Sequence, residues 1–282
     1  MGLEIFKGRK LVIATMHGKE KIIAPILESA LGVICHVPQG FDTDRFGTFS
    51  GEIPRKKDPV EIAREKCLAA MNLTGSDLAI ASEGSFGPHP SYFFAPADDE
   101  WIVLTDSINK LQISGRKLST ETNFGATRIN SMEEGLDFAA KHGFPAHAMI
   151  IRNEEGGISD IVKNITDENR LKTVIDDFLK KYGEAWIETD MRAMHNPTRQ
   201  SVIKEATENL IELLKNSCPS CDTPGFQVSN IEPGLPCETC NMPTRSTLAM
   251  VFHCSKCRFE ERKLYPHKKE TESAMYCDFC NP

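Results

Sequence analysis

Short apolar runs alternate with amphipathic stretches over the first 215 residues of the chain. The apolar runs, of which Lys10–Ala14 and Trp101–Thr105 are the clearest, are typical of strands in a sheet that is covered on both faces. A helix is predicted to begin at Pro59, with Asp58 as its N-cap, and another at Met132, with Ser131 as its N-cap. The predicted elements also include strands at residues 10–14, 33–37, 78–81, 101–105, 145–151 and 185–190, and helices at residues 22–31, 132–142, within 161–182 and 200–215. This alternation predicts an α/β domain with a mixed or parallel sheet flanked by helices.

The predicted strand at residues 78–81 is the centre of the candidate site. We expect it to end before Glu83, and we expect Gly84 and Gly87 to form a turn in which the backbone can approach a ligand closely. Asp106 follows a later strand in the same way. Because ligands bind at the carboxyl ends of strands in open α/β sheets, Glu83 and Asp106 are candidate metal ligands or general bases. The alternative interpretation is a surface turn with a solvated glutamate.

The turn after the first predicted strand, Thr15–Lys21, is a candidate anion site. Free backbone N–H groups and the helix dipole attract negative charge at such a position, and Lys19 adds a positive charge. The glycine spacing of a Walker loop is absent, and the alternative is an ordinary turn with solvated lysines. The segment Phe41–Pro54 is polar and rich in aromatics, and it is predicted to form an ordered loop or hairpin over the site.

The overall composition restricts the class of protein. The chain has 282 residues, a net charge of -7 and a pI of about 5.7, which argues against a broadly basic surface for nucleic acid. No apolar run approaches the length of about 20 residues that spans a bilayer. The N-terminus lacks the basic start and long apolar core of a signal peptide. We therefore expect a cytoplasmic protein that does not enter a membrane.

The most specific motif is a set of four C-x-x-C pairs near the C-terminus: Cys218 and Cys221, Cys237 and Cys240, Cys254 and Cys257, and Cys277 and Cys280. Eight thiolates can fill two tetrahedral Cys₄ sites, which predicts two structural zinc ions, with iron–sulfur ligation as the alternative. The spacings suit zinc ribbons or a cross-braced pair of sites, and they leave the pairing open. The segments Leu248–His253 and Arg258–Tyr265 are predicted to form a hairpin with the third C-x-x-C pair at its turn. We predict a domain boundary that separates an α/β domain at residues 1–216 from a small zinc-ribbon-like module at residues 217–282.

Several segments resemble motifs of the inosine/xanthosine triphosphatases, which are ITPase- and Maf-like nucleotide pyrophosphatases. The similar segments, in the order of that family, are Thr15-Met-His-Gly-Lys19, Ala63-Arg-Glu-Lys66, Ile80-Ala-Ser-Glu-Gly84, Trp101-Ile-Val-Leu104 and Thr198-Arg-Gln-Ser-Val202. The C-terminal segment Tyr276–Pro282 and the segment Asp42–Phe49 also resemble a bacterial family of unknown function with a C-terminal module of four C-x-x-C pairs. The chain is identified as a member of that family, whose first domain is a distant relative of the triphosphatases.

The resemblance implies an ITPase/Maf-like fold, and it implies that Lys19, Lys66 and Arg199 contact phosphates while Glu83 binds Mg²⁺ or orients water. With the strand-end acid, the predicted catalytic residues are Glu83, Lys19 and Asp106. The predicted substrate-binding residues are Thr15, His17, Lys66, Gly84, Ser85, Arg192, Thr198 and Arg199. Two departures from the family motifs, His17 in place of a proline and Glu65 in place of an asparagine, leave the base specificity open.

Two hypotheses follow for the function. The first is a metal-dependent hydrolase of the pyrophosphatase type, which acts with Mg²⁺ on a nucleotide or a related phosphate compound and carries a structural zinc tail. The second is a non-catalytic zinc-ribbon adaptor that binds a protein or nucleic-acid partner. Basic residues of the module would support nucleic-acid binding, but nearby glutamates offset much of their charge.

Overall fold

The computed structural model describes residues 2–43, 46 and 57–282, so most of the loop predicted over the site lies outside the described residues. The chain divides into two compact units. The first, the α/β unit, is Phe6–Ile211, and the second, the cysteine module, combines the N-terminal residues through Ile5 with Glu212–Pro282. Among the described helices, none is both long enough and apolar enough to cross a membrane.

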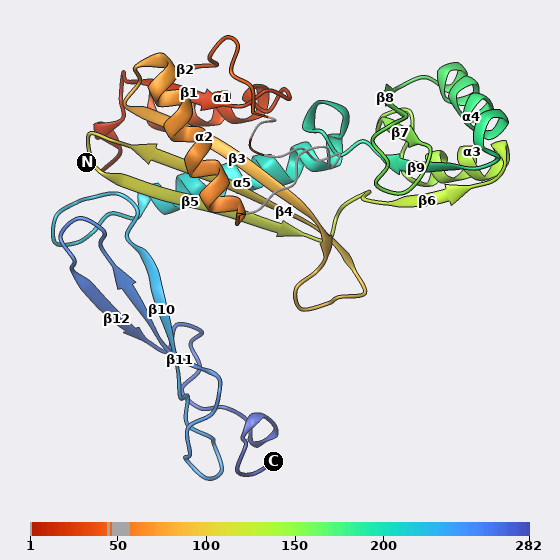
Figure 1. The fold of residues 1–282 in the computed structure, drawn as a ribbon. Helices are drawn as coiled ribbons and strands as arrows, with labels where there is room; N and C mark the ends of the chain where they lie inside the picture. Colours follow the sequence, from red (N-terminus) through yellow and green to blue (C-terminus); the bar gives the residue numbers. More distant parts are fainter. Residues whose placement is uncertain (1, 44–45, 47–56) are drawn as a thin grey trace. The chain divides into compact units, whose positions relative to one another are not determined.

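The main sheet of the α/β unit has five strands in the order β2-β1-β3-β4-β5 (Figure 1). β1 pairs in parallel with β2 and β3, whereas β3, β4 and β5 pair in antiparallel fashion. The strands are β1 (Lys10–Ala14), β2 (Ile34–His36), β3 (Leu78–Pro88), β4 (Pro96–Asp106) and β5 (Leu111–Ser119). The predicted mixed sheet is therefore confirmed.

Helices cover both faces of this sheet. α2 (Pro59–Thr74) lies on one face, where its small residues pack against Ala79, Ala81 and Val103. α5 (Pro197–Lys215) lies on the opposite face, and it approaches β5 so closely that a Cβ at Gly115 would lie 2.6 Å from the carbonyl oxygen of Ala206. α1 (Glu20–Leu31) contacts β2. The predicted N-cap is confirmed, because the Asp58 side chain accepts hydrogen bonds from two backbone N–H groups of the first turn of α2.

The second sheet of the α/β unit is fully antiparallel, with the strand order β6-β9-β7-β8. Its strands are β6 (Ala126–Ile129), β7 (Met149–Arg152), β8 (Ile161–Ile165) and β9 (Ala185–Thr189). Two amphipathic helices, α3 (Met132–Lys141) and α4 (Glu168–Tyr182), pack their apolar faces on it to form a separate core. A short 3₁₀ segment, η3 (Ala193–His195), lies between β9 and α5.

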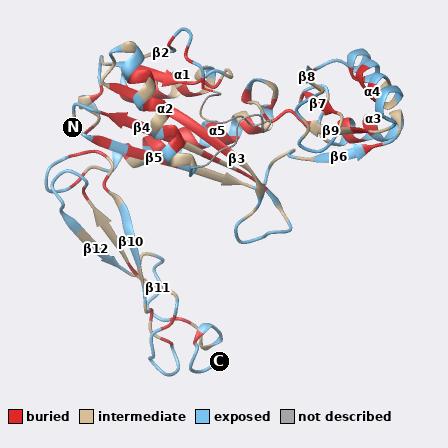
Figure 2. Ribbon diagram, viewed as in Figure 1, coloured by how far each residue is buried: buried red, intermediate tan, exposed pale blue. Residues whose placement is uncertain are grey.

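The cysteine module contains one antiparallel sheet of β10 (Gln227–Pro233), β11 (Thr247–His253) and β12 (Glu260–Leu264). It also has two 3₁₀ segments, η1 (Gly2–Ile5) and η4 (Ala274–Tyr276). Figure 2 shows that buried residues fill most of β1, β3 and β4 in the α/β unit, whereas most of β10 and β12 is exposed. A hairpin at the third C-x-x-C pair, between β11 and β12, is the predicted one.

The expected turn after residue 82 is wrong. β3 continues to Pro88, because β4 pairs with it without interruption from Leu78, opposite Asp106, to Pro88, opposite Pro96. Glu83 and Gly84 therefore lie inside a long strand rather than at its end. The short apolar run indicated only the part of β3 that is buried on both faces.

Candidate functional site

Buried charged groups gather on the α5 face of the main sheet, beyond the point where β1 ends. β1 pairs with β3 only as far as Ala81. Lys19, from the turn between β1 and α1, reaches the next residue of β3. Its ammonium group donates to Oγ of Ser82 at 2.9 Å and lies 3.8 Å from Oε2 of Glu100. Burial lowers the pKa of Lys19 to about 8, although the charge of Glu100 opposes the shift.

Arg199, from the first turn of α5, binds the same glutamate. Its Nε donates to Oε1 of Glu100 at 2.6 Å, and its Nη1 donates to the carbonyl oxygen of Met191. Gly84 lies directly opposite Glu100 on β3, and a Cβ there would lie 2.1 Å from Oε1 of Glu100. The glycine thus leaves space for the buried ion pair, a role different from the expected turn.

Asp98 is a second buried acid on this face. In a strand, residues two positions apart project to the same side, so Asp98 and Glu100 lie together above Ile102. Both carboxylates are fully buried. Burial and the charge of Glu100 raise the pKa of Asp98 to about 8. Asp99, between them, belongs to the other face and binds the guanidinium of Arg116 with both oxygens.

Glu83 and Lys66 form a separate ion pair on the α2 face. Glu83 follows Ala79 and Ala81 on the side of β3 that packs against α2. The ammonium group of Lys66, a residue of α2, donates to the Glu83 carboxylate, and both side chains are buried. The predicted phosphate ligand Lys66 is therefore the partner of the predicted catalytic acid.

Glu83 and Asp106, the two candidate metal ligands at strand ends, do not lie together although their strands are neighbours. Asp106 pairs with Leu78 across β3 and β4, five residues along β3 from Glu83, which is about 17 Å of extended strand. The Asp106 carboxylate instead accepts hydrogen bonds from the Arg9 guanidinium at 2.6 and 3.0 Å and from the Asn109 side chain at 2.8 Å. Asp106 thus links Arg9, which precedes β1, to Asn109 in the turn between β4 and β5. Its role is therefore structural.

Replacing Asp106 with asparagine is expected to lower the free energy of unfolding by about 2–4 kcal/mol, because it leaves the largely buried Arg9 without its main partner. Burial raises the pKa of Asp106, but hydrogen bonds from Arg9 and Asn109 outweigh it and hold the pKa below its usual value. The stabilisation is therefore present above the pKa of an unfolded aspartate, about 3.9, and is lost as the pH falls through the lower folded value. Urea unfolding at pH 7 and pH 3 measures both effects.

Asp77→Asn is the matched control. Asp77 also binds Arg9, through one contact at 2.8 Å, but its side chain is 46% exposed. A partly exposed pair contributes less than about 1 kcal/mol. Equal losses in the two variants would contradict the structural role of Asp106.

A pocket of about 380 Å³, here called the aromatic pocket, lies next to the charged cluster of Lys19, Glu100 and Arg199. Phe86, which stacks on Phe124 at 5.7 Å between ring centroids, forms one wall, and the Arg199 guanidinium lies 5.1 Å from the Phe86 ring. Met191, whose carbonyl oxygen accepts from Arg199, also lines the pocket. The other polar and aromatic lining residues include Arg152, Trp186, Glu188, Thr189, Asp190 and Arg192.

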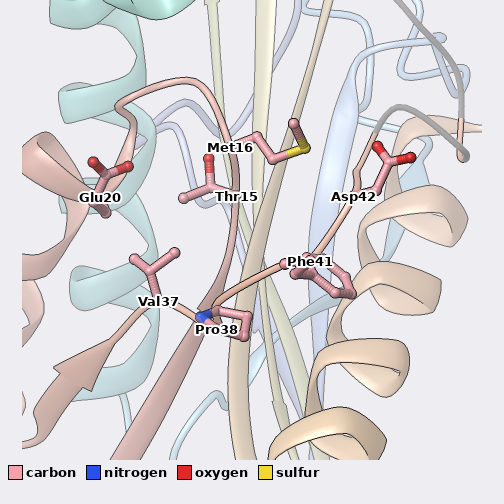
Figure 3. A pocket seen from close by; sticks show the side chains of 8 residues that line it. Thr15, Met16, Glu20, Val37, Pro38, Phe41 and Asp42 are labelled. Atoms are coloured by element: carbon pink, nitrogen blue, oxygen red, sulfur yellow. The ribbon is translucent and has the colours of Figure 1, made fainter.

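A second cavity of about 420 Å³ lies at the turn between β1 and α1 (Figure 3). Thr15, Met16 and Glu20 line it on one side. Val37, Phe41 and Asp42 line it from the segment that follows β2. The predicted substrate residue Thr15 belongs to this cavity and is buried.

The remaining predicted substrate residues are dispersed. The guanidinium of Arg192 binds the Asp190 carboxylate at 2.5 and 2.9 Å and lines the aromatic pocket. Thr198 Oγ1 lies 2.9 Å from Nε2 of His147. His17 is half-buried in the turn before Lys19, and Ser85 is half-buried on β3, opposite Asp99.

The eight cysteines form two groups, and the structure answers the pairing that the sequence leaves open. The first and third C-x-x-C pairs form one group, and the second and fourth pairs form the other, which is a cross-braced arrangement. In the first group, Sγ of Cys218 lies 3.7 Å from that of Cys257, and in the second, Sγ of Cys240 lies 3.6 Å from that of Cys277. Tetrahedral zinc with Zn–S bonds of about 2.3 Å places its sulfurs about 3.8 Å apart. The geometry of both groups fits a zinc ion.

A repeated backbone turn presents the thiols. In each C-x-x-C segment, the carbonyl oxygen of the first cysteine accepts a hydrogen bond from the N–H group four residues later. That fourth residue adopts a positive φ at Asp222, Asn241 and Arg258. Aspartate and asparagine tolerate this left-handed conformation better than most residues, so their position after the cysteines is a local signal for the turn.

Sequence reasoning missed the acids on β4. Asp98 and Glu100 are in phase with Ile102 and Leu104, two buried apolar residues further along the same strand, β4. Two acids on the apolar face of a strand are a signal of a buried polar site, because isolated buried carboxylates are unfavourable. The sequence shows this signal when the predicted strand at residues 101–105 is extended back to Pro96, because the two acids then fall on its apolar face.

Comparison with known proteins gives a family for the larger part of the chain. No curated protein matches the sequence. Residues 66–282, which include β3, β4, Arg199 and all four C-x-x-C pairs, match a family described as a domain of unknown function, DUF6671. The chain therefore belongs to the DUF6671 family.

Proposed function

We propose that the α/β unit is a Mg²⁺-dependent hydrolase of the pyrophosphatase type, acting on a nucleotide or a related phosphate compound, and that the cysteine module holds two structural zinc ions. The observation that carries the proposal is the pair of buried cations, Lys19 and Arg199, beside Glu100 on one face of the sheet. Cations at the carboxyl end of a parallel strand, next to a helix start, suit the charge of a phosphate chain.

The aromatic pocket supports a nucleotide as the substrate. Arg199 joins the charged cluster to this pocket through its contacts with Phe86 and Met191. A nucleobase stacks on aromatic rings and forms hydrogen bonds along its edge, and Trp186, Glu188 and Asp190 supply such groups. The resemblance of five segments to the inosine/xanthosine triphosphatases, and with it an ITPase/Maf-like fold, supports the same substrate class.

The residues of the α/β unit have distinct roles in this proposal. Lys19 and Arg199 hold the phosphates. Glu83, held by Lys66 on the other side of β3, orients the attacking water at the part of this strand that β1 no longer pairs with, where the charge of Glu83 still acts on Lys19. A bound Mg²⁺ ion supplies charge neutralisation on the phosphate oxygens. Asp106 has no part in the reaction, because its carboxylate belongs to the network with Arg9 and Asn109.

The test is the release of phosphate and pyrophosphate from a panel of normal and deaminated nucleoside triphosphates, with and without Mg²⁺. Lys19→Ala is expected to lower kcat/KM by about 100-fold or more, because it removes a buried positive charge from the phosphates. Lys204→Ala is the matched control, since Lys204 is an exposed lysine of α5 that pairs with Glu208. Glu83→Gln is expected to abolish metal-dependent release.

Two outcomes would overturn parts of the proposal. No release from any member of the panel, with folded and zinc-loaded protein, would reject the hydrolase. Release that survives both Lys19→Ala and Glu83→Gln would retain the activity but reject this assignment of the residues.

A non-catalytic adaptor is the second candidate, and one observation favours it. Met275, Tyr276 and Phe279, around the last C-x-x-C pair, are 67, 64 and 62% exposed. Exposed apolar groups of this size are typical of surfaces that bind a partner. The adaptor predicts no turnover in the panel, so the same experiment separates the two candidates.

A further inference from the structure

We propose that Asp98 and Glu100 form the site at which the α/β unit binds a divalent cation. This inference rests on the proposed function, because it assigns the ligands of the catalytic ion. It replaces the expected pair of Glu83 and Asp106, which the strand register separates.

Three carboxylate oxygens at this site have no hydrogen-bond partner among the described residues: both oxygens of Asp98 and Oε2 of Glu100. Both side chains are nevertheless fully buried. Removing a carboxylate from water without a partner is strongly unfavourable. A cation that binds both groups would remove this penalty.

The neighbouring protein cations donate no hydrogen bond to these three oxygens. Arg199 donates to the other oxygen of Glu100, Oε1, at 2.6 Å. Lys19 lies 3.8 Å from Oε2, beyond hydrogen-bond distance, while its ammonium group donates to Ser82. One oxygen of Glu100 and two of Asp98 thus remain for an ion on the same side of β4.

The kind of ligand at Asp98 and Glu100 indicates the class of cation. Oxygen ligands from carboxylates suit hard cations such as Mg²⁺ and Mn²⁺, whereas zinc in this chain has the cysteine groups. Within the described part of the chain, groups of three or more metal-binding side chains occur only at the cysteines, so Asp98 and Glu100 supply two ligands. Mg²⁺ is usually held by one or two carboxylates, with water and phosphate oxygens in its other positions.

The charges around the site also favour a divalent cation. Two acids, Asp98 and Glu100, lie with two cations, Lys19 and Arg199, and a bound divalent ion keeps both carboxyl groups ionised, so that the four side chains together carry no net charge. The divalent cation makes the site doubly positive. That charge attracts a phosphate chain, which could then complete the coordination of the ion.

The test uses Mn²⁺ as the probe, with zinc-loaded full-length protein and no nucleotide. Electron paramagnetic resonance of free Mn²⁺ measures the dissociation constant. The wild type is expected to bind one Mn²⁺ per chain, and Asp98→Asn and Glu100→Gln are each expected to weaken binding at least tenfold. Asp99→Asn is the matched control, because this acid is adjacent in sequence but lies on the opposite face with Arg116.

The outcomes separate this inference from the proposed function. Absence of Mn²⁺ binding by the wild type, or equal binding by Asp98→Asn and Asp99→Asn, would overturn the inference. Far-ultraviolet circular dichroism checks that each variant is folded, and the conservative Glu100→Gln change provides a second, independent test. Mn²⁺ binding that depends on Asp98, together with a silent nucleotide panel, would support the cation site and reject the hydrolase.

Discussion

Removal of the metal from both cysteine groups is expected to unfold the cysteine module while the α/β unit stays folded. The module has a small core in which Cys218 and Cys254 pack with Phe226 and the half-buried Phe252. Structural zinc contributes about 10–16 kcal/mol to the folding of comparable small domains. The cores of the α/β unit include none of these residues, so they do not depend on the metal.

Limited proteolysis with and without a strong chelator measures this effect. Residues 212–282 are expected to become sensitive, and tryptophan fluorescence is expected to stay unchanged, because both tryptophans, Trp101 and Trp186, lie in the α/β unit. Metal analysis is expected to give two zinc ions per chain. A module that stays resistant after complete removal of the metal would contradict a role of zinc in its folding.

The cross-braced pairing has a sharper test of its own. Cys221→Ser with Cys257→Ser changes two thiols of one group, and one zinc ion per chain is expected to remain. Cys221→Ser with Cys240→Ser changes one thiol in each group, and both zinc ions are expected to be lost or bound much more weakly. We expect this difference because a structural zinc site requires four ligands, so the loss of one thiol weakens a site as a whole. Equal zinc content in the two double variants would reject the pairing.

Much of the fold follows from local sequence patterns. The N-cap at Asp58 with Pro59 after it, the capped helix after Ser131 and the hairpin around Cys254 and Cys257 depend on residues close together in the chain, and all three are confirmed. The end of β3 depends instead on pairing with β4, a segment about 20 residues away. The alternation of residues in Ser82–Phe86 indicates this pairing only weakly. Glycine at position 84 favoured a turn, but here it makes room for a side chain on the next strand.

Of the residues in the charged cluster at the candidate site, only the two cations could be predicted from the sequence. Lys19 and Arg199 stand in segments with recognisable neighbours, at a strand end and at a helix start. The partner of Arg199, Glu100, is 99 residues away, and only the folded sheet brings the two together. The same applies to the second and fourth C-x-x-C pairs, because eight equivalent thiols carry no local information about pairing.

Replacing Arg199 with methionine is expected to lower the free energy of unfolding of the α/β unit by about 3–5 kcal/mol. The change leaves Glu100 as a buried carboxylate without its main partner, and breaking one side of a buried ion pair has an effect of this size. Methionine has a similar length and fills most of the space, so lost packing contributes little. Urea unfolding followed by tryptophan fluorescence measures the change, because both tryptophans report on this unit.

A double variant distinguishes an ion pair from simple packing. Arg199→Met together with Glu100→Leu removes both charges, and replacing both partners of a buried pair by apolar groups is often neutral. We therefore expect the double variant to be more stable than Arg199→Met alone, with a coupling energy of about 2–3 kcal/mol between the two positions. Additive losses would contradict a direct interaction between Arg199 and Glu100. Both proteins are expected to lack hydrolase activity, because phosphate binding requires the guanidinium whichever way stability changes.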